Sequence, residues 1–178
     1  MTSLQKLSDM RTEAPMTSEV LVRGATVHDA PEIARIVNGY AERGKMLPRP
    51  LAAVYQFLRD FSVAEMDGRV IGCAALSIFW GDLAEVRSLA VSESHRGQGI
   101  GKRLVRYLLR EAQGLGIPRV FALTYEVGFF EALGFHQISR DTLPRKIWRD
   151  CINCVHFADC DETALIIDIA PQPEEKDS

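Results

Sequence analysis

The chain has 178 residues, of which 47% are hydrophobic and 25% are charged, and its formal net charge at pH 7 is -3. This length fits one domain with its own core, and the slight negative charge gives no reason to expect nucleic acid as a partner. No stretch reaches the roughly 20 apolar residues of a membrane span and the N-terminus lacks the apolar centre of a signal peptide, so we expect a cytoplasmic protein without membrane attachment.

Both ends of the chain are predicted to be disordered tails. Residues 1–18 are polar without a sustained hydrophobic period, and residues 171–178 are rich in proline and acidic side chains. Such segments bury too little apolar surface to become ordered. We therefore place the folded domain at residues 19–170.

Strand-like and helix-like segments alternate between these tails. In chain order, we expect a strand at 19–26, a helix at 28–44, a short helix at 51–61, two strands within 62–80, a strand at 82–91, a helix from Ile100 to Gly114 or Gly116, a strand at 118–125, a short helix within 127–135 and a strand at 162–170. Asp29 and Pro31 mark the start of the first helix, and Asp67-Gly68 is a strong hairpin signal. This order indicates an α/β domain with a mixed sheet flanked by helices.

Residues 92–109 combine three glycines with basic side chains at the start of an amphipathic helix. The glycines lie between a strand and a helix, where backbone N–H groups and the positive end of the helix dipole attract anions. The run matches neither the Rossmann fingerprint nor the P-loop. It indicates a phosphate-binding turn, with a loop that merely closes a turn as the alternative. The helix carries one apolar stripe, made of Ile100, Leu104, Val105, Leu108, Leu109 and Ala112.

The run VRSLAVSESHRGQGIGKRLV resembles the acetyl-CoA motif of the GNAT family of N-acetyltransferases. The family pattern is Arg/Gln-x-x-Gly-x-Gly/Ala, and Arg96, Gly99 and Gly101 fill its fixed places. The run FFEALGF is similar to the second family signature, a short helix followed by Leu-Gly-Phe and a strand. The resemblance covers residues 20–169. It implies the GNAT fold, a mixed, mostly antiparallel sheet of about six or seven strands flanked by helices.

The resemblance also implies that the bound phosphates belong to acetyl-CoA, the co-substrate. The backbone from Arg96 to Lys102 would hold the pyrophosphate, while Lys102 and Arg103 either add charge or form a solvated helix face. The residues expected to contact acetyl-CoA are Leu89, Ala90, Val91, Arg96, Gly97, Gln98, Gly99, Ile100, Gly101, Lys102, Phe129 and Phe130.

A narrower resemblance, to the short single-domain N-acetylglutamate synthases of bacteria, rests on LPRP, AEVRSLAV, LTYEVGFFEALGF and LPRKIWRDCINCVHFADCDETAL. It implies acetyl transfer to the α-amino group of L-glutamate, as in the first step of arginine biosynthesis, with glutamine as a rival acceptor. Two alternatives stay open: a transferase for another small amine or a protein N-terminus, and a sensor that binds acetyl-CoA without turnover. A homodimer is also open.

Acetyl transfer to an amine requires a base, because an α-amino group with a pKa of about 8 is largely protonated at neutral pH. Glu85 and Arg87 lie two residues apart in a predicted strand and therefore share one face. Glu85 is the candidate base, and it also occupies the place where several family members keep one. Arg87 is the candidate to hold an acceptor carboxylate. A cross-strand ion pair that stabilises the sheet is the structural alternative for both.

The family implies two further roles. The sheet splays after the fourth strand, which would leave backbone amides near Ala90 and Val91 to stabilise the oxyanion. The leaving thiolate usually receives its proton from a Tyr in the second signature, but Phe130 stands there. Tyr125 is the nearest substitute, with a packed core Tyr as the alternative and water as another proton source.

A dicarboxylate acceptor requires several cations, and the family places three candidates around its acceptor cleft: Arg49, Arg87 and Lys146. The four cysteines include the run CINCVHFADC, in which Cys151, Cys154 and Cys160 suggest a structural metal, with His156 as a further candidate ligand. Zinc sites ordinarily pair two Cys-x-x-Cys motifs across a longer spacer. We therefore favour packed thiols, assign no metal, and leave redox sensing open.

Overall fold

A computed structural model of the chain describes residues 18–144 and 160–170. Seven strands form one sheet in the order β1-β2-β3-β4-β5-β7-β6. The strands are β1 (Leu21–Gly24), β2 (Phe61–Met66), β3 (Arg69–Trp80), β4 (Leu83–Val91), β5 (Arg119–Thr124), β6 (His136–Ile138) and β7 (Thr163–Asp168). The α-helices of the described ranges are α1 (Ala30–Ala41), α2 (Leu51–Gln56), α3 (Ile100–Gly114) and α4 (Val127–Glu131). The expected mixed sheet with flanking helices is confirmed.

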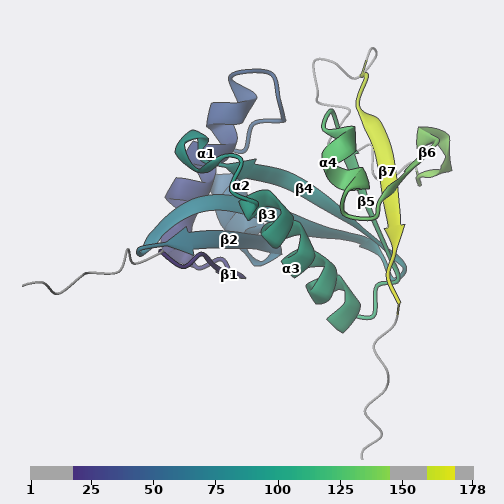
Figure 1. Cartoon of the computed structure of the whole chain (residues 1–178), viewed down its shortest axis with the longest axis horizontal. Helices are drawn as coiled ribbons and strands as arrows, with labels where there is room; N and C mark the ends of the chain where they lie inside the picture. Colours follow the sequence, from purple (N-terminus) through teal and green to yellow (C-terminus); the bar gives the residue numbers. More distant parts are fainter. Residues whose placement is uncertain (1–17, 145–159, 171–178) are drawn as a thin grey trace, which may run out of the picture.

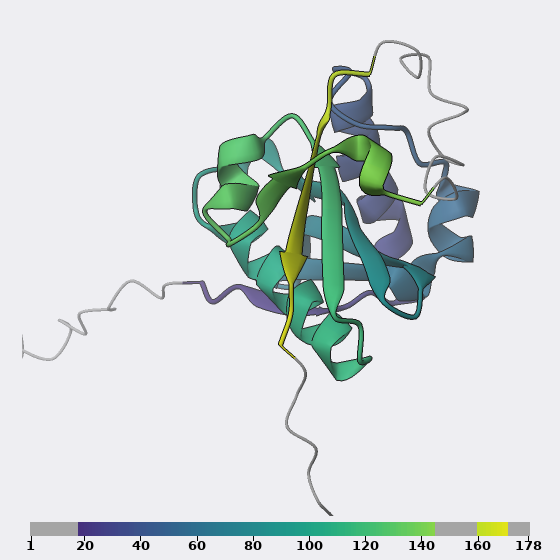
Figure 2. The ribbon, with the colours of Figure 1, turned by 90° about the vertical axis from the view of Figure 1, so that its right-hand side faces the viewer.

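Neighbouring strands run antiparallel except at the centre, where β4 and β5 are parallel. Helix α3 connects these two strands, as a parallel pair requires a crossover. Figure 1 shows α3 lying across one face of the sheet, and Figure 2 shows β7, in yellow, between β5 and β6. Separate groups of buried apolar side chains pack beneath α3 and beneath α1.

Two local predictions from the sequence are confirmed. The turn between β2 and β3 is formed by Asp67 and Gly68, both with positive φ (52° and 73°), which is the backbone conformation of a tight hairpin. The predicted apolar stripe of α3 faces the core, with five side chains buried and Leu109 partly buried. Residue spacing therefore determined the orientation of this helix correctly.

The structure differs from the local expectations at three further places. The segment 51–61 is not one helix, because α2 ends at Gln56, residues Leu58–Asp60 form a 3-10 turn and β2 begins at Phe61. Strand β6 has only three residues and produced no alternation in the sequence, although the family resemblance implied a strand after Phe135. Asp29 adopts the N-cap position of α1, but its carboxylate accepts hydrogen bonds from Thr26 instead of from the helix.

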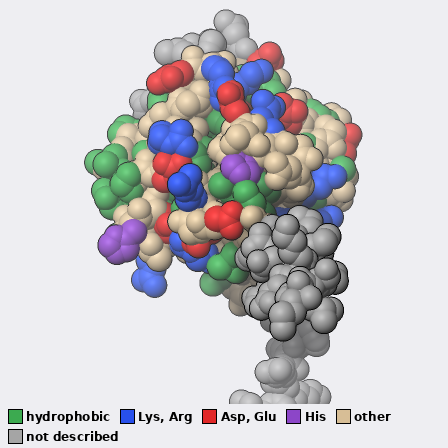
Figure 3. All heavy atoms as spheres, turned by 60° about the vertical axis from the view of Figure 1, so that its left-hand side comes forward, with side chains coloured by type: hydrophobic (Ala, Val, Ile, Leu, Met, Phe, Trp, Pro, Cys, Tyr) green, Lys and Arg blue, Asp and Glu red, His purple; other side chains and the backbone are tan. Residues whose placement is uncertain are grey.

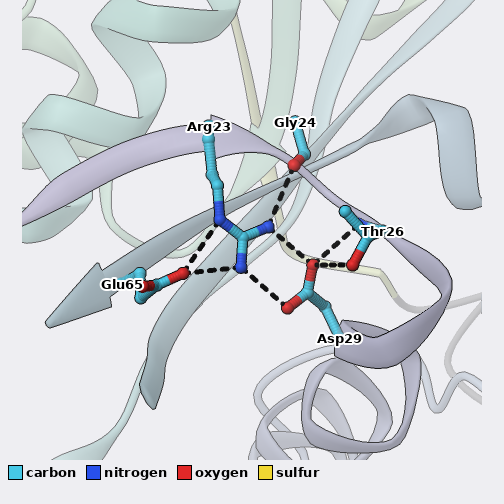
Figure 4. Close-up of polar contacts among 5 residues, drawn as sticks. All are labelled: Arg23, Gly24, Thr26, Asp29 and Glu65. Atoms are coloured by element: carbon cyan, nitrogen blue, oxygen red, sulfur yellow. Dashed lines mark hydrogen bonds and ion pairs between the residues drawn. The ribbon is translucent and has the colours of Figure 1, made fainter. Parts of the chain in front are cut away.

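The carboxylate of Asp29 belongs to an ion-pair network that we call the Arg23 network: Arg23, Thr26, Asp29 and Glu65 (Figure 4). Arg23 donates from Nη1 and Nη2 to Asp29 at 2.7 and 3.0 Å, and from Nε to Glu65 at 2.9 Å. The network ties β1 to β2 and to the start of α1.

Surface properties agree with the composition. Acidic and basic side chains are interspersed on the face shown in Figure 3. Among the helices in residues 18–144 and 160–170, none combines the length and hydrophobicity needed to span a bilayer.

Candidate active site

The central strands β4 and β5 are paired only near their starts and then diverge. They pair only at Ala84 with Val120 and at Glu85 with Phe121. Beyond this point β4 continues beside β3 as far as Val91, and β5 continues beside β7 as far as Thr124. The edge of β4 that faces β5 therefore has no strand beside it after Glu85. A cleft of about 540 Å³ opens there.

Segments from across the chain line this cleft. They come from β4, from the end of β5, from the end of α1 and its following loop, from the glycine run, from α4 and from the residue before β7. The lining residues are Tyr40, Arg43, Lys45, Met46, Val86, Arg87, Ser88, Leu89, Ala90, Val91, His95, Arg96, Gly97, Leu123, Thr124, Tyr125, Glu126, Phe129, Phe130 and Glu162.

A bulge in β4 shapes the wall of the cleft. Ala75 faces Arg87 and Cys73 faces Ala90, so β4 has one residue more than β3 in this interval. Ser88 takes a positive φ of 52° there, and the buried Cys73 thiol lies 3.7 Å from its carbonyl oxygen. The extra residue reverses the alternation of the strand. Ala90 consequently packs on the α1 side of the sheet, the side that carries Arg87.

Glu85 and Arg87 share one face of β4, but only Arg87 lines the cleft. Arg87 lines it, with its guanidinium carbon 5.9 Å from the centre of the Phe57 ring. Glu85 is half-buried at the last β4–β5 pair, one side chain further along the same face, and is not a lining residue. The residues directly opposite in the sheet are Ser77 and Phe121 for Glu85 and Ala75 for Arg87, all uncharged.

Tyr125 lies in the cleft wall with 43% of its surface exposed. The alternative of a packed core Tyr is therefore wrong. Partial burial, a hydrogen bond with Asp161 and the nearby carboxylate of Glu162 raise the pKa of Tyr125 to about 12. The phenol is therefore protonated at neutral pH, and its raised pKa makes it a weaker acid than an ordinary Tyr. Burial likewise raises the pKa of Glu162 above its usual range.

Phe130, at the place of the family's usual Tyr, lies in the core with only 4% of its surface exposed. Its ring packs edge-on against Phe129 and Phe135, each with its centre 5.1 Å away. Phe130 contributes to the cleft lining, but its side chain has no group that can donate a proton. Proton donation from this wall therefore depends on another residue.

The glycine run has the geometry of an anion site. Gly97 and Gly99 take positive φ values of 76° and 75°, and a Cβ added at either would meet no atom within 4 Å. Gly99 is the N-cap of α3, so the first N–H groups of a 15-residue helix have no partner within the helix. Arg96 adds an exposed positive charge beside the cleft. These features fit a phosphate group.

The other residues predicted to contact the cofactor differ in whether the side chain or only the backbone is accessible. The side chain of Ile100 is fully buried, so only its backbone can meet a ligand. A Cβ at Gly101 would lie 3.3 Å from the Phe129 ring, which shows that this glycine lets α3 pack against α4. Arg103 donates to the carbonyl of Val20, so its side chain is directed away from the expected phosphate. Gln98 is exposed and Lys102 is half-buried in the same turn.

Residue patterns missed several cleft residues. Arg43 and Lys45 come from the loop after α1; the Arg43 guanidinium lies 4.8 Å from the centre of the Tyr40 ring and pairs with Glu93. His95, which had no assigned role, lines the cleft with Nδ1 2.9 Å from the hydroxyl of Ser92. Exposed charges in a loop carry no periodic signal, and only their proximity to the LPRP segment could have pointed to them.

The remaining predicted residues are distributed as follows. Arg49 is half-buried and outside the cleft lining, and its backbone is bonded to Asn38. Lys146, Cys151, Cys154 and His156 lie outside the described residues. Within 18–144 and 160–170, no group of three His, Cys, Asp or Glu side chains could hold a metal ion. The Cys160 thiol lies 3.7 Å from Glu162 Oε2.

Comparison with known proteins agrees with this geometry. The model of the acetyltransferase (GNAT) family matches residues 33–135. A protein of Chlorobaculum tepidum named an uncharacterized N-acetyltransferase is 43% identical over 149 residues, which are 84% of this chain and 96% of the relative. The amino-acid acetyltransferase of Mycobacterium tuberculosis is 41% identical over 131 residues, or 71% and 74% of the two chains.

Solved structures are similar as well. N-acetylglutamate synthase from Neisseria gonorrhoeae, complexed with coenzyme A and N-acetyl-glutamate, superposes with a TM-score of 0.78 at 32% identity. The match covers 86% of this chain but only 36% of the synthase. A Mycobacterium tuberculosis protein in complex with CoA and NLQ gives a TM-score of 0.73 at 31% identity, covering 84% of this chain and 99% of that one. This chain belongs to the GNAT family. It is an N-acetyltransferase of the GNAT fold.

Proposed function

We propose that the enzyme transfers the acetyl group of acetyl-CoA to the α-amino group of L-glutamate, or of the closely related L-glutamine. The observation that carries the proposal is a cleft whose lining extends from the turn before the N-terminus of α3 to Arg87 on β4. A relative that is 41% identical is named an amino-acid acetyltransferase, and two similar structures contain coenzyme A.

Acetyl-CoA would bind with its pyrophosphate at the turn that precedes α3. The open, left-handed backbone at Gly97 and Gly99 allows phosphate oxygens to approach the N–H groups closely. The rest of the cofactor would follow β4, where the backbone of Leu89, Ala90 and Val91 has no neighbouring strand on the β5 side. Phe129 closes this side of the cleft.

The acceptor amine would approach the thioester carbonyl from the Arg87 side. Glu85 removes the ammonium proton, directly or through a water molecule, because only the neutral amine attacks. The new C–N bond places negative charge on the carbonyl oxygen, and backbone N–H groups near Ala90 and Val91 stabilise it. The C–S bond then breaks and Tyr125, protonated at neutral pH, supplies a proton to the thiolate.

Arg87 would hold a carboxylate of the acceptor, with Arg49 and Lys146 as the further cations. A guanidinium group binds a carboxylate through two parallel hydrogen bonds, which fixes the orientation of the amine. Arginine biosynthesis is the pathway in which such a product is made. We also propose that the enzyme acts in the cytoplasm and that its catalytic domain spans residues 19–170.

A thiol-release assay across the free amino acids, simple amines and peptide N-termini tests the proposal. We expect turnover with glutamate or glutamine. Arg87→Ala removes a charged hydrogen bond worth roughly 1.5–3 kcal/mol, so the apparent acceptor constant should rise about 10–150-fold. The constant for acetyl-CoA should barely change.

Arg119→Ala is the control, because Arg119 pairs with Asp82 at the opposite end of the sheet. It should leave both substrate constants unchanged. Two results would show that the acceptor is not a free amino acid: turnover restricted to peptide N-termini, or an acceptor constant in Arg87→Ala within twofold of wild type. A lower melting temperature with unchanged constants would assign Arg87 to the stability of the sheet.

A further inference from the structure

Asn38, near the end of α1, binds the main chain of Arg49 with both halves of its side-chain amide. Its Nδ2 donates to the Arg49 carbonyl at 2.9 Å, and its Oδ1 accepts from the Arg49 N–H at 2.9 Å. Both residues are half-buried. Two short bonds between groups eleven residues apart fix the loop after α1 to the helix.

The sequence around Arg49 explains why this partner is needed. Arg49 stands between Pro48 and Pro50, neither of which has a backbone N–H. Arg49 therefore has the only backbone N–H donor of the three residues. Because a proline follows, Arg49 favours an extended conformation, in which its N–H cannot form a helical hydrogen bond. An Asn side chain offers one acceptor and one donor group, which matches an extended residue.

These bonds leave the guanidinium group of Arg49 out of the contact, because both involve only main-chain atoms. They fix where the side chain starts and in which direction it leaves the loop. The same loop borders the cleft through Lys45 and Met46. Asn38 therefore fixes the main chain of Arg49 in the loop whose earlier residues, Lys45 and Met46, line the cleft.

A second contact of α1 provides a comparison. The Tyr40 hydroxyl donates to the carbonyl of Val91 at 2.7 Å, at the end of β4. Two positions along a helix differ by about 200° around its axis, so Asn38 and Tyr40 point in nearly opposite directions. One side of α1 holds the loop of Arg49, and the other holds the strand expected to bind acetyl-CoA.

We propose that Asn38 is a positioning residue for the acceptor and acts through Arg49. The inference rests on the proposed function, in which Arg49 binds an acceptor carboxylate. Loss of the Asn38 amide should displace Arg49 and weaken acceptor binding, while the site for acetyl-CoA keeps its geometry. Tyr40 should have the opposite selectivity, because its partner lies on β4.

The experiment is a double-mutant cycle on the full chain with Asn38→Ala, Arg49→Ala and the double variant. Asn38→Ala removes two hydrogen bonds, and we expect the apparent acceptor constant to rise roughly 5–50-fold. The constant for acetyl-CoA should stay within twofold. The double variant should have the same apparent acceptor constant as Arg49→Ala alone, because Asn38 acts only through Arg49.

Control variants separate positioning from a general loss of stability. Arg35→Ala, on the same helix, removes only an exposed pair with Glu32 and should leave both constants unchanged. Tyr40→Phe should raise the constant for acetyl-CoA more than that for the acceptor. Asn38→Asp keeps an acceptor for the Arg49 N–H but places a carboxylate oxygen against the Arg49 carbonyl, so it should raise the acceptor constant at least as much as Asn38→Ala. It replaces Asn38→Ala if that variant does not fold.

The outcomes distinguish this inference from the proposed function. An unchanged acceptor constant in Arg49→Ala would overturn the acceptor role of Arg49 itself. A raised constant in Arg49→Ala together with an unchanged one in Asn38→Ala would overturn only the positioning role. Additive effects in the double variant, or a lower melting temperature with both constants unchanged, would also overturn the positioning role.

Discussion

Two groups of charged side chains, the Arg23 network and the charged residues of the cleft, differ in their surroundings. In the Arg23 network, the guanidinium group is bonded to two carboxylates, and only 8% of the Asp29 side chain is exposed. In the cleft, Arg87, Arg96 and Glu162 border about 540 Å³ of open volume. A charge whose hydrogen bonds are all made within the protein contributes mainly to stability, whereas a charge that also borders open volume can in addition contact a ligand.

The backbone causes this difference. Continuous pairing of β1 with β2, with Arg23 on one strand and Glu65 on the other, brings the network together. The cleft exists because pairing between β4 and β5 stops at Glu85. Changes in the cleft should therefore alter kinetics with little effect on unfolding, and changes in the Arg23 network should do the reverse.

The largest effect is expected at the boundary between the paired and the diverging parts of β4. If Glu85 is the base, Glu85→Gln should lower the rate by roughly 10²–10⁴-fold, because the amide cannot accept the ammonium proton. The acidic limb of the pH–rate profile should disappear with it. Steady-state kinetics from acidic to neutral pH measure both effects.

Glu131→Gln is the matched control, since Glu131 is an exposed glutamate on α4 whose carboxylate accepts a hydrogen bond from the Gln137 side chain. It should leave the rate and the profile unchanged. A Glu85→Gln enzyme with the wild-type pH profile would place Glu85 among the residues that only stabilise the sheet.

A smaller effect is expected at the anion site. Gly99→Val adds a side chain where the backbone is left-handed and the space is open, so it should block close approach of the pyrophosphate. Loss of one charged hydrogen bond corresponds to roughly a 10–150-fold rise in the apparent constant for acetyl-CoA. The acceptor constant should change little.

The other end of α3 supplies the control for this variant. Gly116 has nearly the same φ, 76° against 75° at Gly99, and equally open surroundings. Gly116→Val should therefore cause similar strain and a similar loss of melting temperature. If both variants shift the constant for acetyl-CoA equally, strain explains the result and the phosphate assignment at Gly99 is wrong.

Features that depend only on residues close together in the sequence could be predicted from it. Spacing identified the Asp67-Gly68 hairpin and the buried stripe of α3, because turns and helix faces are set within a few residues. It could not locate the end of pairing at Glu85 or the bulge at Ser88, since both depend on the registers of two other strands. Arg43 and His95 were missed for the same reason: only the folded chain brings them to the cleft.

The smallest effect concerns the Arg23 network and its dependence on pH. Hydrogen bonds from Arg23 are the main reason why the pKa of Asp29 falls from 3.8 to about 2. Because the pKa is lower in the folded state, the contribution to stability is present above about pH 4 and is lost as the pH falls toward 2. At 1.36 kcal/mol per pKa unit, this contribution is at most about 2.4 kcal/mol.

Asp29→Asn should therefore be less stable than wild type at pH 7, and the two unfolding free energies should converge as the pH approaches 2. Denaturant unfolding at several pH values measures the difference. Glu32→Gln is the control, because Glu32 pairs with Arg35 on the surface of α1 and such pairs contribute only about 0.2–0.5 kcal/mol. Acetyl-transfer constants at pH 7 should remain those of wild type in both variants. Parallel stability curves for wild type and Asp29→Asn would show that this carboxylate does not link protonation to unfolding, and the contrast between network and cleft would then not rest on charge.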